Sequence, residues 1–156
     1  EGDALVNVLR QQHTLRQREV CTRAHHDVQP PGDASQWLTP AFEPTAKDGR
    51  IYGRGAADDK AGVVAHLTAI ETLKAIAGDD FDLGISIFIE GEEEAGSRTF
   101  RAFLDENKDK LAADVIIVAD SMNWSPEVPA LTVSLRGRLC NHFRNQSVTY
   151  NCWHQC

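Results

Sequence analysis

The C-terminal part of the chain lacks acidic residues and lysine, and methionine is scarce throughout. Of its 156 residues, none after Glu127 is acidic, none after Lys110 is a lysine, and Met122 is the only methionine. Its longest apolar runs are about five residues, which excludes a bilayer-spanning segment, so we expect no membrane partner. The net charge of −7 argues against a nucleic-acid partner held by phosphate contacts. No charged-then-apolar leader opens the chain, and we interpret it as a fragment of a cytoplasmic protein.

The composition that is present indicates a folded domain. Hydrophobic residues make up 42% of the chain and charged residues 25%, which is typical of a globular protein. A domain of this length buries roughly two thirds of its unfolded surface, so a real core is expected.

Apolar periodicity predicts three strands. Residues 81–90 alternate between apolar and other side chains, and residues 131–135 alternate in the same way. The unbroken apolar run 115–118, within residues 114–120, is typical of a strand covered on both faces. Residues 20–24 make only a poor strand candidate.

Two segments carry a helical period. Residues 58–77 place apolar side chains three and four apart, with Asp58 or Asp59 as the cap at the start and Gly78 at the end. Residues 97–111 repeat this spacing, with Ser97 as the expected N-cap. Residues 25–57 are rich in Pro and Gly and are predicted to be mostly loop. This alternation of strands and helices predicts an α/β fold with helices on the faces of a sheet.

Four polar clusters follow or flank these elements, where α/β proteins bind ligands. They are His25-His26-Asp27, Asp58-Asp59-Lys60, Glu92-Glu93-Glu94 and Asp120. Each has an ordinary structural interpretation when taken alone, as a polar turn, a helix cap or a solvated face. Together, one imidazole and several carboxylates at corresponding strand ends make a set of ligands suited to a divalent metal such as zinc. Adjacent glutamates also allow one to bind metal while the other takes a proton from water.

Three strings in order carry a family resemblance: HHDVQP at 25–30, GRGAADDK at 53–60 and EGEEEAGS at 90–97. In combination they resemble the M20 family of metallopeptidases, particularly its carnosinase-like dipeptidase branch. The resemblance covers roughly residues 24–137. It implies a zinc-peptidase-like (phosphorylase/hydrolase-like) mixed sheet flanked by helices, incomplete here, with two Zn²⁺ per full-length member and Mn²⁺ or Co²⁺ as alternatives.

The resemblance also assigns roles to single residues. Asp27 would orient a metal-binding histidine, and Glu93 would be the general base that deprotonates the attacking water. Asp58 would bridge the two ions. The metal ligands that it implies are His25, Asp58, Glu94 and Asp120.

The chain departs from the family in several places. Family members are more than twice as long and carry a lid and dimerisation domain and a further histidine ligand downstream. We therefore interpret residues 1–137 as a partial catalytic domain and residues 138–156 as a tail foreign to the family. Residues 10–23 and this tail have the composition expected of a shifted reading frame.

The expected function is hydrolysis of dipeptides or related amide bonds by a metal-activated water, impaired in this chain. The alternatives are an amino-acid deacylase or aminoacylase of the same family, and an inactive metal-binding fragment. A small peptide is the expected partner, and a homodimer is expected for full-length members.

Overall fold

The computed structural model describes residues 7–10, 18–78 and 81–133. These residues belong to two compact units that divide after Met122. The expected tail at 138–156 and residues 134–135 of the last expected strand lie outside the described residues. Residues 131–133 of that strand have no regular structure. In the second unit, the described residues form a short loop closed by the bridge between Ser125 and Val128.

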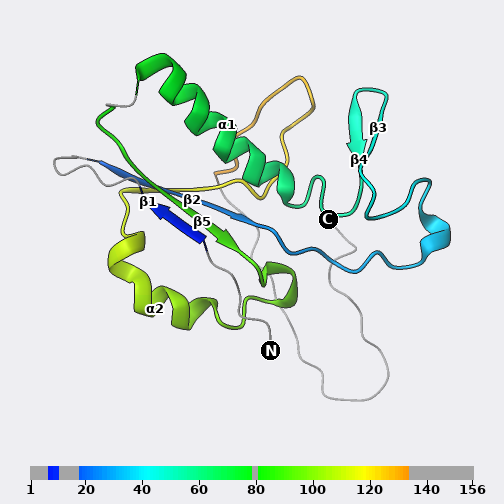
Figure 1. Cartoon of the computed structure of the whole chain (residues 1–156), viewed down its shortest axis with the longest axis horizontal. Helices are drawn as coiled ribbons and strands as arrows, with labels where there is room; N and C mark the ends of the chain where they lie inside the picture. The colour runs from blue at the N-terminus through cyan, green and yellow to red at the C-terminus, as the bar shows by residue number, and fades with distance from the viewer. Residues whose placement is uncertain (1–6, 11–17, 79–80, 134–156) are drawn as a thin grey trace. The chain divides into compact units, whose positions relative to one another are not determined.

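The first unit is built on a four-stranded mixed sheet in the order β1-β5-β2-β6 (Figure 1). Its strands are β1 (Asn7–Arg10), β2 (Glu19–His25), β5 (Gly84–Glu90) and β6 (Val115–Val118). β2 runs parallel to both β5 and β6, whereas β1 is antiparallel to β5. The predicted α/β mixed sheet is therefore confirmed.

The sequence pattern made residues 20–24 a poor strand candidate, but they belong to β2, which lies between β5 and β6 in the sheet. Its register sets Arg23 opposite Phe88 and His25 opposite Glu90. Arg23 forms an ion pair with Glu90, and its guanidinium lies 5.2 Å from the centre of the Phe100 ring. These contacts engage the guanidinium group of the residue that made this stretch look unlike a strand, whereas Arg23 Nε is buried without a hydrogen-bond partner among the described residues.

Two helices lie on opposite sides of this sheet (Figure 1). They are α1 (Lys60–Ala77) and α2 (Phe100–Leu111). The prediction for α1 is confirmed to within two residues, with Asp59 as N-cap and Gly78 as C-cap. Phe88 of β5 packs against Phe100 and Phe103 of α2, with ring centres 5.7 and 5.5 Å apart.

The start of α2 differs from the prediction. Its N-cap is Thr99, and Ser97 instead lies in the left-handed region at φ 49°. The carboxylate of Glu92 accepts hydrogen bonds from both the backbone and the hydroxyl of Thr99, which fixes the turn before the helix. The 3-10 turn η2 (Glu93–Ala95) lies within this connection.

The residues between β2 and α1 are mostly loop, as predicted. They also contain the 3-10 turn η1 (Ala34–Gln36) and a small hairpin of β3 (Thr45–Lys47) and β4 (Arg50–Tyr52).

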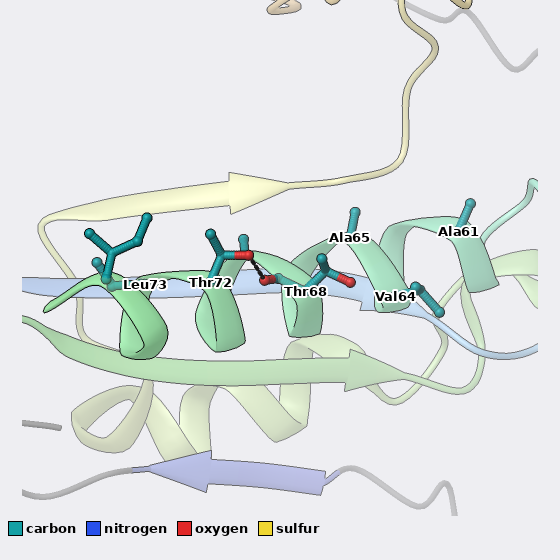
Figure 2. A pocket seen from close by; sticks show the side chains of 8 residues that line it. Ala61, Val64, Ala65, Thr68, Thr72 and Leu73 are labelled. Atoms are coloured by element: carbon teal, nitrogen blue, oxygen red, sulfur yellow. Dashed lines mark hydrogen bonds between the residues drawn. The ribbon is translucent and has the colours of Figure 1, made fainter. Parts of the chain in front are cut away.

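The expectation that Val115–Val118 is covered on both faces was wrong. These four residues are 47 to 64% exposed, and β6 pairs with β2 alone among the described residues. An unbroken apolar run thus identified a strand correctly but not its surroundings. The outward face of α1 is likewise open, with a shallow apolar hollow that runs along the helix (Figure 2).

The buried side of α1 is set by small and polar residues rather than by the predicted apolar stripe. Gly62 and His66 are its buried residues, whereas Leu67 is 42% exposed. His66 Nε2 lies 3.0 Å from the carbonyl oxygen of Arg23. A Cβ at Gly62 would collide with the Ala119 carbonyl and the Asp59 carboxylate, so glycine allows the close approach of helix and sheet.

We expect Gly62→Ala to destabilise the fold by about 1–3 kcal/mol, because overpacking at this contact outweighs the gain in helix propensity. The measurement is the free energy of unfolding by urea. Thr68→Ala, at an exposed position of the same helix, is the matched control and should change it by less than about 0.7 kcal/mol. A more stable Gly62→Ala protein would contradict the packing described here.

Candidate metal centre

The candidate site is built around His25, the last residue of β2, which is only 1% exposed. Its backbone N–H donates to Asp59 Oδ2 at 3.1 Å, so the start of α1 holds the end of the strand. Its ring nitrogen Nδ1 lies 3.1 Å from the Asp27 carbonyl oxygen and 3.3 Å from Asp27 Oδ1. A carbonyl oxygen only accepts, so Nδ1 donates in this contact, and Nε2 is the ring nitrogen that faces Asp58 and Asp120.

Carboxylates from two different segments approach the other nitrogen of this ring. Nε2 lies 3.0 Å from Asp58 Oδ1 and 4.0 Å from Asp120 Oδ1. Asp120 follows β6, and Asp58 precedes α1. The structure therefore brings together His25, Asp58 and Asp120, which the sequence separates widely.

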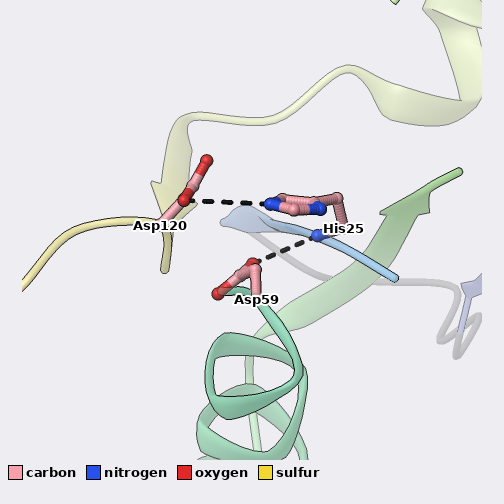
Figure 3. A group of neighbouring side chains, drawn as sticks. All are labelled: His25, Asp59 and Asp120. Atoms are coloured by element: carbon pink, nitrogen blue, oxygen red, sulfur yellow. Dashed lines mark hydrogen bonds and ion pairs between the residues drawn. The ribbon is translucent and has the colours of Figure 1, made fainter. Parts of the chain in front are cut away.

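Asp59 is the residue of this site that the sequence interpretation placed only as a helix cap. One ligand atom each from His25, Asp59 and Asp120 lie within 4.8 Å of one another (Figure 3). However, Asp59 accepts the His25 N–H through Oδ2 and the Gly62 N–H through Oδ1. Both of its oxygens are thus already engaged with the backbone, whereas the Asp58 side chain is 64% exposed. The doublet of aspartates before a helix was the available signal, but it does not reveal this division of roles.

The second group of predicted residues lies in and next to η2. Asp27 accepts from the backbone N–H of Glu93 through Oδ1 at 3.2 Å and from that of Glu94 through Oδ2 at 2.9 Å. The same carboxylate therefore faces the His25 ring and holds the glutamate turn. This positioning contact to Glu93 and Glu94 was not foreseen from the sequence.

The carboxylates around His25 favour positive charge at this site. Burial acts to lower the pKa of His25, but Asp120, Glu93, Asp27 and Asp58 together outweigh it and raise that pKa. Burial raises the pKa of Glu93, and it also raises the pKa of Asp120. A carboxyl with a raised pKa takes up a proton more readily, which suits a general base.

The ligand chemistry fits a divalent cation. An imidazole nitrogen and carboxylate oxygens are donors that zinc accepts, and three protein donors are the number found in catalytic zinc sites. The crowded negative charge around Nε2 is what such an ion would neutralise.

Neither helix in the described part of the chain has the length and apolar character that spanning a membrane requires.

Comparisons with known proteins also assign the chain to a class of peptidases. The profile of peptidase family M20/M25/M40 matches residues 21–151, and the chain belongs to that family. The match begins inside β2 and continues beyond Gly137, where the resemblance in the sequence was expected to end.

Individual relatives are similar over most of this chain. It is 38% identical over 120 residues to the beta-Ala-His dipeptidase of Homo sapiens, covering 76% of this chain and 24% of that protein. It is 36% identical over 118 residues to the succinyl-diaminopimelate desuccinylase of Coxiella burnetii, covering 74% and 31%.

Among solved structures, human carnosine dipeptidase 1 superposes with a TM-score of 0.66 at 34% identity, over 76% of this chain and 26% of that one. The chain thus spans about a quarter to a third of the length of these relatives.

We expect Asp27→Ala to lower the free energy of unfolding by about 2 kcal/mol, because two backbone N–H groups lose a charged acceptor. The amides of Glu93 and Glu94 should also exchange hydrogen faster. Asp33→Ala is the control, since Asp33 accepts a backbone N–H from Ser35 in an exposed turn, and its cost should be below about 1 kcal/mol. Equal costs for the two variants would contradict a special role for Asp27.

Proposed function

We propose that this chain carries the metal-binding part of a dipeptidase-type hydrolase that cleaves amide bonds with an activated water. The observation that carries the proposal is the convergence of Asp58 and Asp120 on the Nε2 atom of His25. Membership of peptidase family M20/M25/M40 supports it.

The proposed ligand sets use the residues that the sequence singled out. His25, Asp58 and Asp120 would hold one divalent ion, and Asp58 with Glu94 would contribute to a second. Zinc is the ion that the mixture of imidazole and carboxylate favours, with Mn²⁺ or Co²⁺ as alternatives. The second set has no histidine among its two residues and would bind more weakly.

A bound divalent ion supplies two effects, a lower pKa for water and a polarised substrate carbonyl. The residues of the chain supply the proton transfers. Glu93 would accept the proton of the attacking water on its carboxylate and then deliver it to the leaving amine. Asp27 would hold His25 in one tautomer and keep the backbone of Glu93 in place through its hydrogen bonds.

A second function has a specific observation in its favour. One of the relatives is named as a desuccinylase, which supports removal of an acyl group from an amino acid as the alternative reaction. Parallel assays with dipeptides and with N-acyl amino acids separate the two. An inactive metal-binding fragment would hold the ion and turn over neither.

The remaining parts of the proposal rest on the family resemblance. They are a small peptide as substrate, a cytoplasmic location, and a homodimer for full-length members of the family.

Metal binding gives the first test. We expect the purified chain to retain about one zinc ion after dialysis, because one ligand set has three protein donors. Asp58→Ala should lose bound zinc, since Asp58 belongs to both sets. Asp105→Ala, an exposed change on α2, should keep it. Elemental analysis measures the content, and two tightly held zinc ions in the unaltered chain would contradict the proposal.

Catalysis gives the second test. We expect the chain to hydrolyse dipeptides slowly at best with added Zn²⁺, Co²⁺ or Mn²⁺. Glu93→Ala should lower any such rate by about 10²–10⁴-fold while the bound metal stays unchanged. Loss of metal from Glu93→Ala would show that Glu93 is a ligand rather than the base.

A further inference from the structure

The side-chain amide of Gln29 makes two contacts with a single residue on another segment. Its Nε2 donates to Glu94 Oε2 at 2.8 Å and to the Glu94 carbonyl oxygen at 3.1 Å. An amide nitrogen carries two hydrogens, so both bonds form at once. Gln29 therefore fixes the carboxylate of Glu94 relative to its own backbone.

Asp27 completes this attachment from two residues away. Its Oδ2 accepts the Glu94 backbone N–H at 2.9 Å. The segment after β2 thus holds Glu94 at three points, which are its N–H, its carbonyl oxygen and one carboxylate oxygen. Because the same segment also contacts the His25 ring, the positions of His25 and Glu94 are linked through the chain that joins them.

The kind of donor matters as much as its position. A neutral amide orients a carboxylate without cancelling its charge, whereas a lysine or arginine at this place would compete with a cation. Since Gln29 engages Oε2, the other oxygen of Glu94 remains as the donor for an ion. Holding a half-buried carboxylate in one rotamer also removes the entropy that it would otherwise lose on binding.

We propose that Gln29 is a positioning residue that orients Glu94 toward the second metal ion. The inference rests on the proposed function, because it requires Glu94 to be a ligand. Gln29 itself would touch neither the ion nor the substrate. Its effect should appear in the affinity for the second ion and leave the ion held by His25, Asp58 and Asp120 unchanged.

The test is a calorimetric titration of the metal-free chain with Co²⁺, taken to millimolar concentration so that a weak second equivalent is seen. Gln29→Met has nearly the same shape but no donor. It should weaken the second equivalent by roughly tenfold or more, the usual effect of removing a hydrogen bond to a ligand, and change the first by less than about twofold. Asn107→Ala is the matched control, because it removes an amide-to-carbonyl bond on α2.

A second variant separates orientation from simple structural support. Gln29→Lys keeps a donor beside Glu94 but adds a positive charge, so it should also weaken the second equivalent while it preserves the unfolding midpoint. Equal loss of both equivalents in Gln29→Met, or no change in the second, overturns the inference and leaves the proposed function intact. Uptake of a single Co²⁺ by the unaltered chain also overturns the inference and leaves the proposed function intact. If the unaltered chain binds no Co²⁺ at all, the proposed function fails with it.

Discussion

The buried imidazole of His25 is the point on which the arrangement of this unit depends. Its backbone is tied to the start of α1 through Asp59, and its ring is tied to the following loop through Asp27. Asp27 in turn holds the turn that carries Glu93 and Glu94. One strand end therefore joins a helix, a loop and a turn. The free-energy cost of burying these polar atoms is offset, because the backbone N–H and both ring nitrogens have polar partners.

Two pairs of acidic residues contact this histidine in different ways. Asp59 and Asp27 have their oxygens directed at backbone N–H groups, which makes them part of the framework. Asp58 and Asp120 approach Nε2 from more exposed positions and are the carboxylates proposed to bind an ion. Burial, and to a smaller extent neighbouring carboxylates, raise the pKa values of Asp120 and Glu93. Such shifts are typical of functional sites.

The elements with clear periodicity could be predicted from the sequence, and those fixed by distant partners could not. β5 and α1 alternate or repeat strongly, and both lie within two to three residues of their expected bounds. β2 was undervalued because Arg23 interrupts it, and its partners Glu90 and Phe100 lie far along the chain. In the site, the strand-end clusters were visible as polar motifs. The roles of Asp59 and Gln29 were not, since hydrogen bonds to backbone atoms of other segments leave no periodic signal.

The ion pair between Arg23 and Glu90 also selects the alignment of the two strands. A one-residue slip between paired strands moves every side chain to the opposite face, so the register is specified by the side chains that must stay buried and paired. A slip of β2 against β5 would turn Arg23 toward the opposite face and leave Glu90, which is 4% exposed, without its cation. An unpaired buried charge costs several kcal/mol, so the misaligned sheet is penalised. The same alignment places His25 beside the last residue of β5, and a structural charge pair thereby determines where the proposed metal ligands meet.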